Sequence, residues 1–441
     1  MNKFIYRLKH DIPHMIHNIK APRNRLLQLF AIEGVLFTLV NNLINNNNNL
    51  FATRLGANDF ELSLVILLPQ LAGMLVLLPG GILTDRMSNK RNMVVGALAT
   101  VTVIYVLIGF VPALDSGRLG AFLILLALSA GPMTMYNVSW QAYFSDVVGV
   151  EARNRIWTAR TGLAFLIGIA VPICSGALLA SAATTDAKIT IHQIFFWIGC
   201  VLLITQIAVL RRINSNQEHQ SSGIGIRDLK AAFLELAHNK KFLSFVSVAM
   251  FFYVTWQIDW TLYFVGEVYY LGMNEVWLSY LNISTAVIQF ITIGFWSRIN
   301  ARFGVRFGII FGSFGLAFCP ISMIVATSIP PADGKLIFLI MNTISNLAFA
   351  TVSLNILQCL LQVLPERNKT LSISIYTVLV SLSNAVMPLA GVSIYRLFGA
   401  DKRALQTVFW IIFVFRIIST GLWTLRWWTL RKLPDSCSIA Q

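Results

Sequence analysis

Long apolar stretches alternate with short polar ones along the whole chain. A helix needs about 20 apolar residues to cross the hydrocarbon core of a membrane. Windows of this kind recur at residues 26–48, 62–84, 93–112, 119–144, 156–180, 191–210, 242–264, 276–296, 307–326, 336–364, 371–394 and 405–425. The pattern therefore predicts an all-α membrane protein with twelve transmembrane helices.

One polar interval is longer than the others and divides the predicted helices into two groups of six. It covers residues 212–241 and is typical of a cytoplasmic linker. We therefore expect a six-helix bundle over 26–211 and a second one over 242–428. A basic amphipathic arm at 1–25 and a cytoplasmic tail at 429–441 complete the predicted organisation.

The net charge of +15 has to be considered together with its placement. Most of the 34 Lys and Arg residues share one side of the predicted membrane if both termini are cytoplasmic. This bias orients the chain in a cell membrane and argues against nucleic acid as a partner. A hydrophobic share of 56% and a mean hydropathy of +0.69 fit a chain surrounded by a lipid bilayer. The five cysteines and six histidines show no metal-ligand spacing, so we expect no metal and no cofactor.

The inner loops of the two halves repeat weakly. "DRMSNK" at 85–90 and "SRINAR" at 297–302 carry basic residues in register. "EARNR" at 151–155 and "ERNK" at 366–369 match at nearly the same offset. Parallel six-helix repeats are a known transporter architecture, so the repeat favours a transporter.

The stretch "PGGILTDRMSNKR" at 79–91 resembles the loop 2-3 signature of the major facilitator superfamily. That signature runs Gly, three residues, Asp-Arg, one residue, Gly, then basic residues. Ser88 stands where the family usually has Gly, and Asn89 where it usually has a basic residue. The matching residues are Gly81, Asp85, Arg86, Lys90 and Arg91.

The resemblance implies two six-helix bundles that move about a central cavity lined by helices 1, 4, 7 and 10. It also implies that Asp85 meets the N-terminus of helix 11 and acts as a gate, where backbone N–H groups favour a carboxylate. Asp146, at the inner end of helix 4, is then a candidate partner for the basic side chains. Because Asn89 replaces the usual base, this link has to come from Arg86 or Lys90. The alternative is a loop that only enforces topology.

Polar side chains at membrane depth must face protein or a water-filled cavity, because lipid offers no hydrogen-bond partner. At 100° per residue, amide and aromatic side chains share one face on each of the four presumed cavity helices. Amides that only join helices to each other are the alternative interpretation. The predicted solute-binding residues are Asn41, Asn42 and Asn45 in helix 1, Asn137, Trp140 and Gln141 in helix 4, Trp256, Gln257 and Trp260 in helix 7, and Asn342 and Asn346 in helix 10.

The tract "LVNNLINNNNNLF" at 39–51 is expected to continue helix 1 rather than to be disordered. On a continuous helix Asn47 falls on the side opposite Asn41 and Asn45 and reaches the headgroups. We therefore expect Asn47 to tolerate an apolar replacement that Asn45 does not.

Few charges fall inside the predicted helices. Glu33 and Asp259 are candidates for proton coupling, since burial can favour the neutral carboxyl and allow it to take and release a proton. A structural pair with a basic neighbour explains each of them equally well. Arg416 lies near the middle of helix 12 and must find a protein partner, so we interpret it as structural.

The leading hypothesis is a secondary active transporter, not an enzyme, that moves a small organic solute by alternating access as a monomer, with protons as the candidate coupling ion. The alternative is a multidrug-type efflux antiporter, although "GIAVPICSGA" at 168–177 matches the antiporter signature only in part. A membrane-embedded enzyme acting on lipid-linked substrates would need converging His, Asp or Glu residues. The sequence supplies no such cluster, and no GxxxxGK[ST] loop for an ATP-driven pump.

Overall fold

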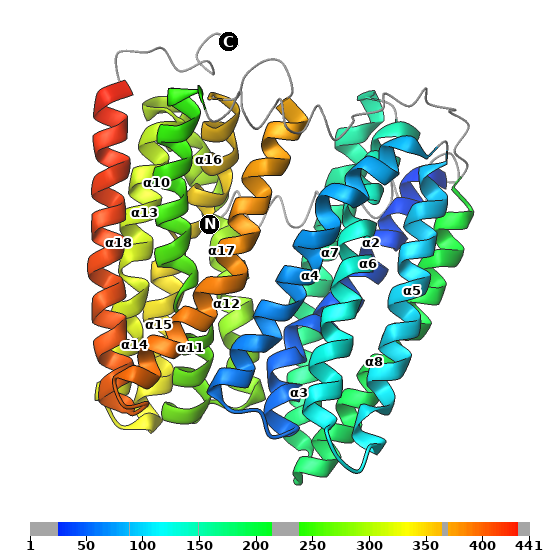
Figure 1. Ribbon diagram of the computed structural model, residues 1–441, viewed down its shortest axis with the longest axis horizontal. Coiled ribbons are helices and arrows are strands. Elements are labelled where there is room, and N and C mark those ends of the chain that lie inside the picture. The colour runs from blue at the N-terminus through cyan, green and yellow to red at the C-terminus, as the bar shows by residue number, and fades with distance from the viewer. Residues whose placement is uncertain (1–24, 88, 149, 214–237, 364–368, 431–441) are drawn as a thin grey trace, which may run out of the picture. The chain divides into compact units, whose positions relative to one another are not determined.

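The computed structural model describes residues 25–87, 89–148, 150–213, 238–363 and 369–430, and these are helical nearly throughout (Figure 1). The expected all-α class is therefore confirmed. The elements in chain order are α2 (Arg25–Leu43), η2 (Asn45–Asn47), α3 (Asn48–Arg54), α4 (Asp59–Arg86), α5 (Lys90–Phe110), η3 (Val111–Ala113), α6 (Arg118–Val147), α7 (Val150–Ser181), α8 (Thr185–Arg211), α10 (Lys240–Gln257), α11 (Trp260–Val265), η4 (Gly266–Tyr270), α12 (Glu275–Phe303), α13 (Val305–Ala317), α14 (Cys319–Ser328), α15 (Pro331–Asn346), α16 (Phe349–Leu361), α17 (Lys369–Leu397) and α18 (Lys402–Leu430).

Ten helical segments of the described chain are long and apolar enough to cross a membrane. Large apolar side chains such as Val103, Val201 and Val414 are exposed along them, as expected for surfaces that face lipid. The helices α7 and α12 are 32 and 29 residues long and are not among these ten segments. A count of twelve crossing helices therefore stays a prediction.

The chain folds into two compact units, which take residues 1–56 with 75–223 and residues 57–74 with 224–441. The helix α4 belongs to both units, since its first part packs in the second unit and the remainder packs in the first. Most of the predicted linker, at 214–237, lies outside the described residues, and so does most of the predicted arm and tail.

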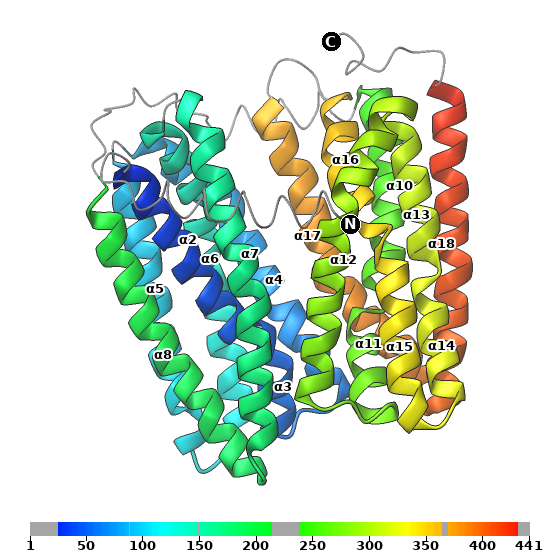
Figure 2. The ribbon, with the colours of Figure 1, turned by 180° about the vertical axis from the view of Figure 1, so that it is seen from behind.

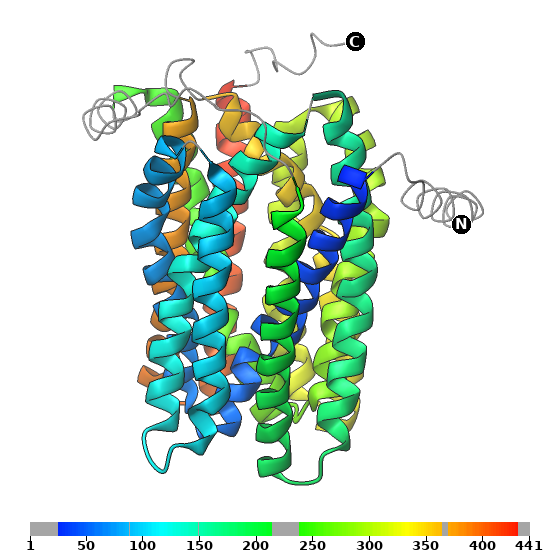
Figure 3. The ribbon, with the colours of Figure 1, turned by 90° about the vertical axis from the view of Figure 1, so that its right-hand side faces the viewer.

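In the first unit α2 packs against both α7 and α8. Figure 3 shows the dark-blue α2 running obliquely between these two helices. The helix α5 packs against α6 and α8, and the ring of Phe51 meets those of Phe122 and Phe196 between the helices. Thr184 caps the start of α8 by accepting a hydrogen bond from the backbone of Ala187.

In the second unit α13 packs against α16 and α18, as Figures 1 and 2 show from opposite sides. Phe245, Phe252 and Trp423 lie in its apolar core. Asn239 and Asn274 cap α10 and α12 with their side-chain oxygens, which satisfies backbone N–H groups that have no partner within the helix.

Three of the four presumed cavity helices are interrupted rather than continuous. The first one passes from α2 through the 3-10 turn η2 into α3, the seventh breaks between α10 and α11, and the tenth breaks between α15 and α16. Non-helical backbone is tolerated at membrane depth only where protein covers it or where it lines a cavity. The breaks lie beside polar side chains that the sequence singles out, among them Asn45, Gln257 and Asn346.

Candidate functional site

The asparagine tract forms a ladder of amide hydrogen bonds across the interruption of the first helix. Asn45 donates to the side-chain oxygen of Asn41 at 2.9 Å, and Asn46 donates to that of Asn42 at 2.9 Å. Asn47 donates to the backbone oxygens of Asn42 and Leu43, at 3.3 and 2.9 Å. The tract is thus ordered, as expected.

The expectation for Asn47 is nevertheless wrong in its premise, because the helix is not continuous. Asn47 bonds the carbonyls that the break at Ile44 leaves unpaired, which gives this side chain a structural task. Asn45 in turn accepts a hydrogen bond of 3.2 Å from the buried hydroxyl of Tyr105 in α5. Its amide is therefore held from two sides within the first unit.

The expected face of α6 is split by the structure. Asn137 and Gln141, one turn apart, are exposed on the first unit. Trp140 is buried instead, since only 4% of it is exposed, and its ring stacks on Phe144 with centroids 5.2 Å apart. Trp140 therefore packs within the bundle, whereas the amides of Asn137 and Gln141 are exposed.

The breaks of the seventh and tenth helices bring aromatic rings together in the second unit. Trp256, near the end of α10, lies 5.4 Å from Trp260 in α11 and 5.1 Å from Phe349 at the start of α16, measured between ring centroids. Gln257 is buried, and its side-chain oxygen has no hydrogen-bond partner among the described residues. Asn346 is the last residue of α15. Its side-chain N–H group donates to both the backbone oxygen and the side-chain oxygen of Asn342, one turn earlier.

Glu33 in α2 carries a fully buried carboxylate within the first unit. We call this carboxylate and the side chains that bond to it the Glu33 centre. Its Oε1 accepts hydrogen bonds from the hydroxyl of Tyr136 at 2.6 Å and from the amide of Gln206 at 2.9 Å. Its Oε2 accepts one from Nε of Arg160 at 3.0 Å. All three partners donate to the carboxylate oxygens, and they come from three different helices, α6, α7 and α8.

The Arg160 side chain reaches Glu33 past a glycine. A Cβ atom at Gly34 would collide with the stem of Arg160, so the absence of a side chain there makes room for the arginine. The guanidinium lies over the Trp140 ring, 4.2 Å from its centroid, and near the rings of Phe37 and Trp157. Aromatic faces favour the cation, so this setting stabilises Arg160 beside the membrane-embedded carboxylate.

A second buried ion pair joins Asp259 and Arg416 in the second unit, with Nη2 and Oδ2 2.6 Å apart. Arg416 also donates to the backbone oxygens of Thr255, Leu316 and Trp256, at 3.0, 2.9 and 3.2 Å. These carbonyls belong to the last turns of α10 and α13, beside their breaks. Arg416 is thus held by four hydrogen bonds. Three of them go to carbonyl groups in the last turns of helices, where the helix itself supplies no donor.

The gating motif is described in part. Gly81 lies in α4, whereas the side chains of Asp85 and Arg86 lie outside the described part of the chain. Lys90, the first residue of α5, forms a salt bridge of 2.8 Å with Asp146 near the end of α6. The sequence leaves Arg86 and Lys90 as candidate partners of Asp146, and Lys90 forms this ion pair.

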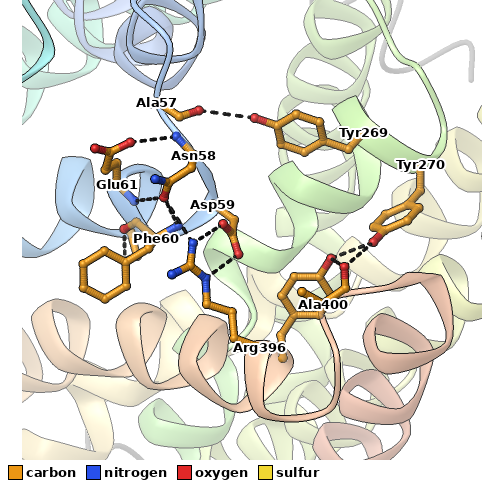
Figure 4. Close-up of polar contacts among 11 residues, drawn as sticks. Ala57, Asn58, Asp59, Phe60, Glu61, Tyr269, Tyr270, Arg396 and Ala400 are labelled. Carbon is orange, nitrogen blue, oxygen red and sulfur yellow. Dashed lines mark hydrogen bonds and ion pairs between the residues drawn. The ribbon is translucent and has the colours of Figure 1, made fainter.

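Another ion pair of the second unit lies at the start of α4. Arg396, at the end of α17, donates from Nε to Oδ2 of Asp59 at 2.9 Å and from Nη2 to Oδ1 at 2.5 Å, as Figure 4 shows. Its Nη2 also donates to the side chain of Asn58, and its guanidinium lies over the Phe60 ring. Two parallel hydrogen bonds of this kind hold both the distance and the orientation of the two helix ends.

The site residues expected from the sequence do not include the three side chains that hydrogen-bond to Glu33. Arg160, Tyr136 and Gln206 lie 127, 103 and 173 residues from Glu33, and no local spacing joins them. The available signal was a charged residue inside a predicted span, which applies to Arg160 as it does to Arg416. Among the described residues no group of His, Cys, Asp and Glu side chains could hold a metal ion.

Comparisons with known proteins agree with this architecture. The sequence profile of the Major Facilitator Superfamily matches residues 30–361. No curated protein sequence gives a match. Solved structures match over most of the chain at low identity, and so show the fold.

Three of them illustrate the likeness. A bacterial homologue of the iron transporter ferroportin in an inward-facing state has a TM-score of 0.71 at 12% identity, covering 91% of this chain and 98% of its own. A bacterial homologue of the human lysosomal transporter Spinster has a TM-score of 0.68 at 13% identity, with coverage of 92% and 97%. The D-xylose-proton symporter has a TM-score of 0.65 at 12% identity, with coverage of 90% and 96%. The chain therefore belongs to the Major Facilitator Superfamily and is a multi-pass membrane protein that transports small solutes.

Proposed function

We propose that the protein is a proton-coupled secondary transporter of a small organic solute, working by alternating access in the cell membrane. The observation that carries the proposal is the Glu33 centre, where a fully buried carboxylate is paired with an arginine whose one hydrogen bond among the described residues is the one to Glu33. A proton on Oε2 of Glu33 would displace the N–H group of Arg160 from that oxygen. Protonation would thereby be linked to the position of a side chain inside the bundle.

Two properties distinguish Glu33 from Asp259 as the coupling residue. Arg160 donates a single hydrogen bond to Glu33, and 14% of its side chain is exposed, so it can move away when the carboxylate is neutralised. Arg416 is fixed by three backbone oxygens in addition to Asp259, so the loss of one bond would not release it. We therefore assign proton coupling to Glu33 and a structural task to the Asp259 pair.

We further propose twelve crossing helices, a single chain as the working unit, and both termini in the cytoplasm. The helices α7 and α12 exceed the length that a crossing needs, which supports the count, and the positive-inside bias supports the orientation. Cysteines introduced into a cysteine-free chain test the orientation. Ser116 lies exposed in the loop before α6 and should react with an impermeant thiol reagent in intact cells, whereas Asn92 should not. The reverse pattern would overturn the orientation.

The solute is proposed to contact the amides and rings at the helix breaks and the exposed amides of α6, with Asn41, Asn42, Asn137, Gln141 and Trp256 among the contacts. The exposed amides of α6 and the aromatic group around Trp256 support this proposal. The same features fit uptake and drug efflux, and the direction follows from the transport assay below. The other proposed contacts are Asn45, Trp140, Gln257, Trp260, Asn342 and Asn346.

The test starts with a thermal-shift screen of the purified protein against a metabolite and drug library, since a ligand that binds the folded state raises its stability. Each ligand found is then followed into proteoliposomes with an imposed pH gradient. We expect Glu33→Gln to lose accumulation driven by the gradient while it retains exchange of labelled for unlabelled solute. Accumulation in Glu33→Gln equal to that of the unaltered protein would contradict proton coupling at this residue.

A further inference from the structure

Within the described part of the chain, the guanidinium of Arg160 donates a hydrogen bond to only one group. Its Nε is bonded to Glu33, and no acceptor among the described residues contacts Nη1 or Nη2. Glu33 is fully buried, whereas part of the Arg160 side chain is open. The two terminal nitrogens thus offer N–H donors at a place that water or a solute can reach.

The surroundings of these nitrogens are aromatic. The Trp140 ring covers one face of the guanidinium, and the Phe37 and Trp157 rings lie within 5.9 Å of its Cζ atom. Phe37 is half-buried and Trp157 is exposed, so both can contact a bound molecule. The buried indole N–H of Trp140 is a further donor without an acceptor among the described residues.

We propose that Arg160 binds the oxyanion group of an organic anion, a carboxylate or a phosphate, whose apolar or aromatic part contacts Phe37 and Trp157. Two parallel N–H donors of a guanidinium match the two oxygens of such a group. This narrows the solute from a neutral amphipathic molecule, which the amides alone would suit, to an anionic one.

Charge balance then links the anion to a proton, a step that rests on the proposed function of Glu33. The Glu33 and Arg160 pair is neutral, so an added anion leaves a buried excess negative charge unless Glu33 takes a proton. The groups that face Glu33 from the packed helices are Tyr136 in α6, Arg160 in α7 and the uncharged Gln206 in α8. None of them supplies a second positive charge, so one anion and one proton are bound together.

Thermal unfolding of the purified full-length protein tests the anion site without any transport. The probes are benzoate, its uncharged counterpart benzamide, and phenyl phosphate, at constant ionic strength. We expect benzoate or phenyl phosphate, but not benzamide, to raise the unfolding midpoint. In Glu33→Gln the competing carboxylate is absent, so the apparent affinity for the stabilising anion should rise about tenfold. Arg118→Gln, which removes an exposed arginine elsewhere, should leave the response unchanged.

The decisive variant is Glu33→Gln combined with Arg160→Gln, which leaves no unpaired buried charge and can therefore fold. It should lose the anion response. An equal shift with benzamide, no shift with either anion, or an anion response that persists in the double variant would overturn the proposal. Anion binding through Arg160 together with gradient-driven transport in Glu33→Gln would refute the proposed coupling at Glu33 and keep the anion site. If Glu33→Gln loses proton coupling but no anion response depends on Arg160, the anion site is refuted and the proposed coupling at Glu33 is kept.

Discussion

Arg396 and Asp59 form two parallel hydrogen bonds that join the end of α17 to the start of α4 within the second unit. The two residues are 337 positions apart in the chain. This contact joins the first part of α4 to the unit in which it packs. The coupling free energy of this pair therefore measures how much the contact stabilises the first part of α4 in the second unit.

A double-mutant cycle measures the pair. Because Arg396 is largely open to water, we expect a coupling of about 0.5–1 kcal/mol between Asp59→Asn and Arg396→Gln in thermal or denaturant unfolding. The double variant should then lose no more stability than either single variant. Additive losses would show that the bonds drawn in Figure 4 contribute no joint stabilisation.

The Asp259 and Arg416 pair should behave as a structural device. Removing one partner of a buried pair typically costs about 3–5 kcal/mol, because the other charge stays buried and uncompensated. We expect Asp259→Asn to lower the unfolding midpoint strongly. For the folded fraction, proton-driven transport per molecule should be close to that of the unaltered protein. A stable Asp259→Asn variant that has lost proton coupling would reverse the assignments of Asp259 and Glu33.

Tyr136→Phe tests the Glu33 centre with a change of one oxygen atom. It removes a donor to Oε1 of Glu33 and an acceptor for Gln206, at about 1–3 kcal/mol for groups left unpaired. Gradient-driven transport should fall and its pH profile should move. Tyr143→Phe is the matched control, since that hydroxyl donates to the backbone of Ile213 instead. An unchanged pH profile in Tyr136→Phe would argue that this hydroxyl does not tune the site.

The asparagine tract now yields a different expectation from the one its sequence suggests. Asn47→Leu should destabilise the protein by about 1–3 kcal/mol, because the carbonyls of the helix break lose their donor. Asn46→Leu, at an exposed position, is the control and should have little effect. Equal unfolding midpoints for the two variants would mean that water replaces the Asn47 amide at no cost.

Gly391→Ala should disrupt the contact between α17 and the break after α10. A Cβ atom at this position would collide with the backbone oxygen of Ile258, which cannot move as a side chain can. Gly421→Ala is the matched control, because space is open around that helical position and alanine favours a helix by about 1 kcal/mol. We expect a lower unfolding midpoint only for Gly391→Ala. A normal midpoint there would show that α17 can shift without loss.

The sequence predicts the helical class and the approximate position of most crossing segments, because apolar windows of membrane length are a direct physical signature. It does not predict the breaks near Ile44, Ile258 and Leu347. Hydropathy stays high through these positions, and the amides that stabilise the breaks are also compatible with a continuous helix. The partners of Glu33 are equally hidden, because they depend on how four helices are packed against each other.

The division of α4 has a consequence for how the protein can be taken apart. This 28-residue helix lies in the first half of the gene, yet residues 57–74 are packed in the unit formed by the second half. A C-terminal fragment made alone would lack a segment of its own unit, and the matching N-terminal fragment would carry that segment without the rest of the unit. Each half should therefore fold less well when it is made alone than when the two halves are produced together.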